Sequence, residues 1–143
     1  MRKSTVFVFT FLCILTFASC SKSNNPAWTW AQELEQKNIL SVAPWRHDEA
    51  YIAFSPLNDV ETLELIELLK GLPKDSFTEN KQLAGITPTF GIQITTASGI
   101  CRINEANAPN GALEIICDET QWWIDSAELA AFVRRITDST LTE

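Results

Sequence analysis

Apolar and polar positions alternate with a period of two through residues 90–124, a pattern typical of β-strands with one buried face. Two-residue turns at Ser98-Gly99 and Glu119-Thr120, and a longer loop centred on Pro109, join four such segments into consecutive hairpins. With these turns, every segment directs its apolar residues to the same side of the sheet. The shared apolar set is Phe90, Ile92, Ile94, Cys101, Ile103, Leu113, Ile115, Cys117, Trp122 and Ile124. The pattern therefore predicts a four-stranded antiparallel meander.

The predicted register places Thr96 opposite Cys101, Cys101 opposite Cys117, and Cys117 opposite Trp122. The β-carbons of directly opposed residues lie about 4.5–5.5 Å apart, and non-hydrogen-bonded pairs are the closest. A disulfide needs about 3.8 Å between its β-carbons, so Cys101 and Cys117 are predicted to form one if their pair is of that closer kind. The alternative is two buried thiols that pack as small hydrophobic side chains.

Two segments that precede the meander have helical spacing. Residues 28–38 predict a short helix. Residues 58–71 predict a longer one, because Asn58 is a good N-cap and Glu61 completes a capping box. Gly71 and Pro73 are expected to end this helix. Its expected apolar stripe is Val60, Leu63, Ile66, Leu68 and Leu69.

A closing helix is predicted after the meander, with Asp125 as its cap and Leu129, Phe132, Val133 and Ile136 facing inward. Residues 39–46 and 49–54 read as strands that either extend one edge of the sheet or cover its other face. Pro44 is expected at an edge or a bend, and residues 74–87 as a polar loop. The predicted class is α+β: a four-stranded antiparallel meander with two amphipathic helices on one face, plus an N-terminal helix and one or two extra strands.

The other face of the meander carries an unusual row of side chains. The predicted register aligns Thr95, Arg102, Ile116 and Trp123 there, with Gln93, Asn104 and Glu114 in the neighbouring row. Arg102, Ile116 and Trp123 are candidate partner-binding residues, since Trp and Arg dominate binding energetics. The alternative is that Trp28, Trp30 or Trp45 packs against this face and completes a second apolar layer.

The first residues predict an export signal. Arg2 and Lys3 precede an uncharged, mostly apolar run from Val6 to Ala18, which is too short for a comfortable membrane span of about 20 residues. Phe17-Ala18-Ser19-Cys20 resembles the lipobox of bacterial lipoproteins. That resemblance implies cleavage before Cys20 and its acylation with fatty chains such as palmitate. An ordinary signal peptide and an uncleaved anchor remain alternatives.

The resulting organisation is a signal peptide at 1–19, a lipidated tether at 20–27, one domain at 28–137 and a flexible tail at 138–143. The full chain of 143 residues has 11 basic and 18 acidic residues, and loss of Arg2 and Lys3 changes its net charge from −7 to −9. Such a surface repels nucleic acid and anionic headgroups. Nucleic acid is therefore not an expected partner, and the lipid on Cys20 must hold the protein at the membrane.

The sequence offers little for catalysis. It has one histidine, His47, within RHDE, and no CxxC or other zinc-ligand spacing. No metal, cofactor or catalytic residue is assigned. A small envelope hydrolase that uses His47 with an acidic partner is the alternative from the enzyme class.

Residues 49–136 resemble small uncharacterised α+β domains of bacterial lipoproteins. The resemblance rests on a strand, the helix DVETLELIELL, a meander that ends in QWWID, and a closing amphipathic helix. It implies a fold and an extracytoplasmic, membrane-anchored location, on the periplasmic face or the cell surface. The leading hypothesis is a binding or interaction module of the envelope with a protein or small-molecule partner, and an inhibitor-like or protective protein is a further alternative.

Overall fold

The residues that alternate in the sequence do form neighbouring strands of one antiparallel sheet. The structure is a computed structural model, and it describes residues 25–47, 51–79, 90–105, 112–117 and 120–140. Within those ranges the sheet has seven strands in the order β2-β1-β4-β5-β6-β7-β3. The strands are β1 (Ile39–His47), β2 (Tyr51–Ala53), β3 (Phe77–Glu79), β4 (Phe90–Thr96), β5 (Gly99–Glu105), β6 (Leu113–Cys117) and β7 (Thr120–Ile124).

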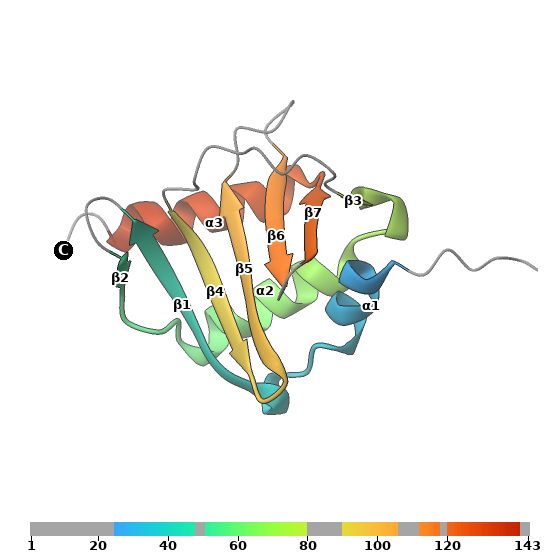
Figure 1. Cartoon of the computed structure of the whole chain (residues 1–143). Coiled ribbons are helices and arrows are strands. Elements are labelled where there is room, and N and C mark those ends of the chain that lie inside the picture. Colours follow the sequence, from blue (N-terminus) through green and yellow to red (C-terminus); the bar gives the residue numbers. More distant parts are fainter. Residues whose placement is uncertain (1–24, 48–50, 80–89, 106–111, 118–119, 141–143) are drawn as a thin grey trace, which may run out of the picture.

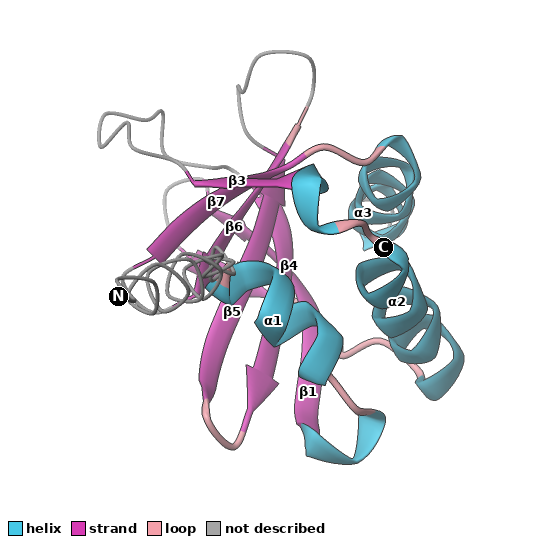
Figure 2. Ribbon diagram, turned by 90° about the vertical axis from the view of Figure 1, so that its right-hand side faces the viewer, coloured by secondary structure: helices cyan, strands magenta, loops and turns pink. Residues whose placement is uncertain are grey.

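The α-helices of these ranges all lie on one face of the sheet (Figures 1 and 2). They are α1 (Pro26–Glu33), α2 (Asp59–Gly71) and α3 (Ala127–Thr140), with short 3-10 turns η1 (Gln36–Asn38) and η2 (Lys74–Ser76). The predicted α+β class is confirmed. The core lies between helices and sheet and includes Leu65, Leu69, Ile92, Ile103, Ile115 and Val133.

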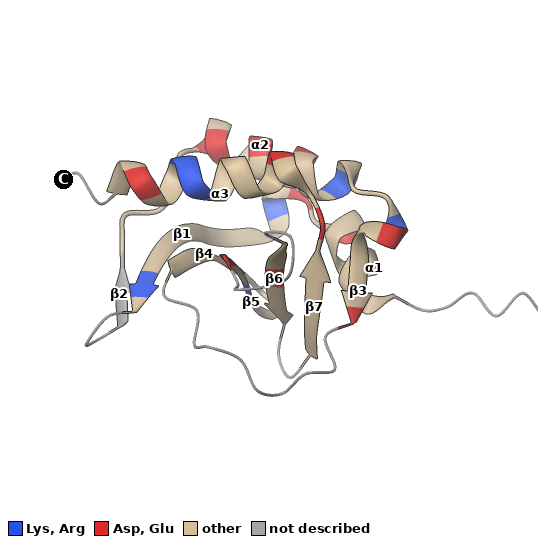
Figure 3. Ribbon diagram, turned by 90° about the horizontal axis from the view of Figure 1, so that it is seen from above, with Lys and Arg blue, Asp and Glu red and all other residues tan. Residues whose placement is uncertain are grey.

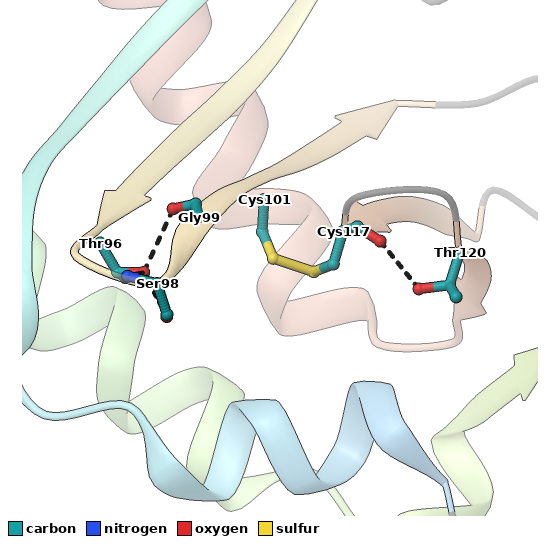
Figure 4. Close-up of a disulfide and its surroundings, with 6 residues drawn as sticks. All are labelled: Thr96, Ser98, Gly99, Cys101, Cys117 and Thr120. Atoms are coloured by element: carbon teal, nitrogen blue, oxygen red, sulfur yellow. Dashed lines mark hydrogen bonds between the residues drawn. A yellow bond between two sulfur atoms is a disulfide. The ribbon is translucent and has the colours of Figure 1, made fainter.

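The first hairpin of the meander has a different register from the one predicted. Ile94 lies opposite Cys101, and Thr96 lies opposite Gly99, so the turn is Ala97-Ser98. The Thr96 side chain stabilises this turn, which has two residues like the predicted one but begins one residue earlier. Its Oγ1 donates to the Gly99 carbonyl oxygen at 3.1 Å and lies 2.9 Å from the Ser98 hydroxyl (Figure 4). Gly99 has a φ of 154°, a value that a side chain would disfavour.

The last hairpin is shifted in the same way. Cys117 lies opposite Thr120 and Ile115 opposite Trp122, so the turn is at 118–119 rather than at Glu119-Thr120. Thr120 Oγ1 donates to the Cys117 carbonyl oxygen at 2.8 Å and closes this turn. Both shifts change the partner by two residues, which leaves the predicted apolar set on its predicted face. The β5–β6 register is confirmed, with Cys101 opposite Cys117.

The N-terminal strands extend an edge of the sheet: β1 pairs with β4, and β2 pairs with β1. Pro44 lies inside β1, where its carbonyl accepts from Phe54 N just beyond the three-residue pairing of β2. The nitrogen of Pro44, which has no hydrogen to donate, therefore faces β2 at a point where the β1–β2 pairing has ended. Proline is tolerated at such a position. At the other edge, β3 pairs with β7 inside a segment predicted as loop. Residues 80–87 of that predicted loop lie outside the described residues.

Helix α1 begins two residues before its predicted start, because Asn25 caps it. The Asn25 Oδ1 accepts from Trp28 N at 3.0 Å, and its Nδ2 donates to the Phe77 carbonyl oxygen at 3.1 Å. The same side chain thus starts the helix and ties it to β3. Trp28 Nε1 donates to the Leu72 carbonyl oxygen at 3.2 Å, which joins α1 to the end of α2.

Helix α2 has the predicted capping box between Asn58 and Glu61. Its apolar stripe differs from the prediction, since Thr62, Leu65, Ile66 and Leu69 are its buried residues. These positions follow the i, i+3, i+4, i+7 spacing of one helix face. Val60 and Leu63 lie off that face and are 76% and 44% exposed.

Helix α3 buries the four predicted residues, but its cap is Ser126 rather than Asp125. Ser126 Oγ accepts from Leu129 N at 3.2 Å, which satisfies a free donor of the first turn. The helix continues to Thr140, into the predicted tail, and residues 141–143 lie outside the described part. Arg135 joins α3 to α2, because its Nη2 donates to both carboxylate oxygens of Glu64 at 2.8 and 2.7 Å.

Gly91 of β4 lies close against the backbone and a side chain of β5. A β-carbon at this position would lie 2.3 Å from the Ile103 carbonyl oxygen and 2.8 Å from Asn104 Oδ1. Neither a backbone carbonyl nor a fully buried amide moves easily. The glycine is therefore required by space rather than by backbone conformation.

We expect Gly91→Ala to lower the free energy of unfolding by about 1–3 kcal/mol, the usual cost of overpacking. Chemical denaturation monitored by tryptophan fluorescence measures it. The matched control is Gly71→Ala, since a β-carbon at Gly71 meets nothing within 4 Å. That variant should stay at wild-type stability or gain up to about 1 kcal/mol. Equal stability of the two variants would contradict the close approach.

Candidate functional site

The sheet has one face that no helix of the described ranges covers, and we call it the open face (Figure 2). It comprises the outward residues of β1 and β3–β7: Ser41, Ala43, Trp45, His47, Thr78, Gly91, Gln93, Thr95, Ile100, Arg102, Asn104, Glu114, Ile116, Gln121 and Trp123. The pairing arranges many of them in two rows across the strands. The first row is Ala43, Gln93, Arg102, Ile116 and Gln121, and the second is Trp45, Gly91, Asn104, Glu114, Trp123 and Thr78.

The structure brings two of the three candidate partner-binding residues directly together. Arg102 lies opposite Ile116 on the neighbouring strand, as predicted. Arg102 is exposed, and its Nε donates to Gln93 Oε1 at 3.1 Å, so the guanidinium is oriented by the adjacent strand. Thr95 is not in this row, because the corrected β4 register places Gln93 there.

Trp123 lies one row away from its predicted place. It is opposite Glu114 on β6 and Thr78 on β3, and it is half-buried. It is thus a diagonal neighbour of Ile116, at a separation of about 7–8 Å that an indole ring can span. Arg102, Ile116 and Trp123 therefore still share one region of the open face, although not one row.

The second row is more buried than a solvated sheet face would be. Trp45 is 6% exposed, Asn104 1% and Glu114 8%. The Asn104 Oδ1 has no hydrogen-bond partner within the described ranges. Asn104 and Glu114 lie side by side as the register predicts, but their burial is not predicted by the sequence pattern. Gly91 was the available signal, because an isolated glycine in a strand often marks a close approach.

One of the three tryptophans considered for this face does lie on it. Trp45 is directly opposite Gly91, on the β1 side of the open face. Trp28 and Trp30 instead pack against the core on the helix side. The alternative that one of these tryptophans packs against this face is therefore met by Trp45.

Charge differs strongly between the two sides of the molecule. The acidic residues Asp59, Glu61, Glu64 and Glu67 lie on α2, among the helices that carry much of the red in Figure 3. The charged residues of the open face, within the described ranges, are Arg102 and Glu114, which are of opposite sign. Although the whole chain has a net charge of −7, the positive and negative charges of this face are therefore equal in number.

A disulfide joins Cys101 and Cys117, with an S–S distance of 1.98 Å and an α-carbon separation of 4.3 Å (Figure 4). The α-carbon separation is that of a non-hydrogen-bonded antiparallel pair, about 4.5 Å, which is the geometry the sequence argument required. The bond lies on the helix-facing side, between the two hairpin turns. It links β5 to β6 one residue pair away from Arg102 and Ile116, which lie on the opposite face of the sheet. The disulfide therefore supports the open face but is not part of it.

His47 is exposed at the end of β1, opposite Tyr51. Its sequence neighbours Asp48 and Glu49 lie outside the described residues. Across the ranges that the structure describes, no three His, Cys, Asp or Glu side chains come together as metal ligands would. In the same ranges, none of the helices combines the length and the hydrophobicity needed to cross a membrane. Cys20 also lies outside the described part, so its acylation stays a prediction.

Comparison with known proteins gives no assignment, since no family model, curated protein or solved structure matches the chain significantly.

We expect the Cys101→Ala/Cys117→Ala double variant to lose about 3 kcal/mol of stability, because the bond closes a loop with a sequence separation of 16. Urea denaturation with and without dithiothreitol measures the loss. The reductant should lower wild-type stability to that of the double variant and leave the variant unchanged. A wild-type protein that dithiothreitol does not destabilise would show that the two cysteines are not bonded.

Proposed function

We propose that the protein is a lipid-anchored binding module of the bacterial envelope, tethered through Cys20 and binding its partner with the open face. The observation that carries the proposal is the position of Arg102 beside Ile116 and near Trp123, on a face without a described helix. Arg and Trp supply large contact area and directed hydrogen bonds, which is why they dominate binding interfaces.

The charge distribution supports the same face. Acidic side chains crowd the helix side and disfavour close approach by most envelope polyanions there. Within the described ranges, the open face has one cation, Arg102, and one anion, Glu114. A protein or a neutral small molecule therefore meets no net electrostatic repulsion there. Gln93 orients the Arg102 guanidinium before any partner arrives, which lowers the entropic cost of binding.

The lipid anchor is supported by the sequence around Cys20, where Phe17-Ala18-Ser19-Cys20 resembles a lipobox. A single acyl chain holds a protein only marginally, whereas two or more hold it firmly. An acidic domain gains nothing from anionic headgroups, so the acyl chains carry the attachment. Function in this proposal requires residence at the membrane surface outside the cytoplasm.

We expect the N-terminal peptide of protein from native membranes to begin at Cys20 and to carry the mass of its acyl chains. Cys20→Ala should abolish this modification and move the protein from the membrane fraction to the soluble fraction. Mass spectrometry and fractionation measure the two effects. Cys13→Ala is the matched control and should change neither. A mature chain that keeps Met1, or an unmodified Cys20, would overturn the anchor.

We expect Arg102→Ala/Trp123→Ala to weaken binding of the partner by at least about 2 kcal/mol, the range of interface hot spots. Crosslinking in intact cells followed by mass spectrometry identifies the partner, and pull-down with purified proteins then measures affinity. The control Val60→Ala/Leu63→Ala removes two exposed apolar side chains from α2. The proposal predicts loss of binding only in the first variant. Equal binding by both, with circular dichroism unchanged, would place the binding surface elsewhere.

A further inference from the structure

The two edges of the sheet leave little room for an added strand. The edge strands β2 and β3 have three residues each. On β3, the Phe77 carbonyl oxygen already accepts from Asn25 Nδ2 at 3.1 Å. Beside β1, the Pro44 carbonyl oxygen accepts from Phe54 N at 3.0 Å. Short and occupied edges disfavour pairing with another chain, so a protein partner is expected to dock on a face of the sheet.

The two charged side chains of the open face differ in accessibility. Arg102 is exposed, whereas Glu114 is only 8% exposed. A partner that lies on this face therefore meets a guanidinium before it meets a carboxylate. Arg102 also belongs to β5, the middle strand of the sheet, so other residues of the face lie on both sides of it (Figure 1).

The surroundings of Arg102 are polar on one side and apolar on the other. Gln93 lies directly opposite on β4, and its Oε1 accepts from Arg102 Nε at 3.1 Å. Ile116 lies directly opposite on β6, with its β-carbon about 4.5–5.5 Å away, and the half-buried Trp123 follows on β7. A guanidinium held in this way presents a planar fork that matches the geometry of a carboxylate. Apolar neighbours strengthen such a contact, because they lower the local dielectric constant.

The acidic surface of the protein does not prevent a single carboxylate from approaching Arg102. Asp59, Glu61, Glu64 and Glu67 lie on α2, on the other side of the sheet (Figure 2). A packed layer lies about 10 Å from its neighbour, and the Debye length is about 8 Å at physiological ionic strength. Salt therefore screens most of the repulsion at the open face. A polyanion would need several cations, and the described part of this face has one.

We propose that Arg102 binds the side-chain carboxylate of an Asp or Glu residue in a protein partner, with an apolar residue of the same segment against Ile116 and Trp123. This inference rests on the proposed use of the open face for binding. A side chain fits better than a chain terminus, because a segment that crosses the face contacts residues on both sides of the central Arg102. Residues i and i+2 of an extended segment point the same way, about 6–7 Å apart, so one can reach Arg102 and the other the apolar side.

NMR titration of the isotope-labelled full chain in uncharged detergent tests this inference. The probe is the peptide acetyl-Leu-Thr-Glu-Thr-Leu-amide, and its matched control has Gln in place of Glu. A third peptide has Gln and a free terminal carboxylate. We expect the Glu peptide to shift the Arg102 Nε–H signal and the Ile116 amide signal. The Gln-amide peptide should bind at least about tenfold more weakly, because it lacks the charge-assisted hydrogen bonds.

Two variants separate the geometry of the guanidinium from its charge. Arg102→Lys keeps the charge but loses the planar fork, so the Glu peptide should bind at least about fivefold more weakly. The matched control Lys70→Ala removes one positive charge from an exposed position on α2 and should keep the affinity within about twofold. Both substituted side chains are exposed in the wild type, and circular dichroism confirms that the variants are folded.

Equal binding of the Glu and Gln-amide peptides, or binding of the free-carboxylate peptide alone, would overturn the inference. So would an equal loss in Arg102→Lys and Lys70→Ala, or the absence of signal shifts with every peptide. Photocrosslinking of a protein partner from Ile100 reports on the open face without depending on charge. A crosslinked partner without peptide binding would therefore overturn this inference alone, whereas the absence of a crosslink would count against the proposed function itself.

Discussion

The two-residue repeat of the pleated sheet is the constraint on which the rest of this structure depends. Each hairpin must connect strands so that residues of the same parity stay on the same side. The turn of the β4–β5 hairpin and the turn of the β6–β7 hairpin meet this condition. The disulfide-linked β5–β6 pair meets it as well. One face therefore collects most of the apolar strand residues, such as Ile92, Ile103 and Ile115, and packs against three helices. The other is left without a described helix and carries Trp45, Arg102 and Trp123.

This constraint also explains which features the sequence could predict. The apolar set, the Cys101–Cys117 pair and the capping box at Asn58 followed from periodicity and local chemistry. The turn positions did not, because side-chain hydrogen bonds of Thr96 and Thr120 favour two-residue turns that begin one residue earlier and keep the same parity. Strand β3 was missed, since three residues show no period and pair only because β7 offers an edge. The burial of Asn104 depends on packing across strands, which no local pattern contains.

The two sides of the sheet have different physical tasks. The helix side contains the core and the acidic surface, and the Arg135–Glu64 pair joins its two long helices. Within the described ranges, the open side has one cation and one anion, and it holds the Arg102 guanidinium beside Gln93 and Ile116. The Asn25 side chain ties α1 to β3 on the helix side, away from the open face.

Site-specific photocrosslinking in intact cells tests the central claim, that the open face is the binding surface, most directly. A photoreactive phenylalanine analogue replaces Ile100 on the open face in one strain and Val60 on α2 in another, since these apolar side chains are 43% and 76% exposed. We predict that a discrete crosslinked partner forms from position 100 and not from position 60. Crosslinks from position 60 alone, or equally from both, would contradict the account.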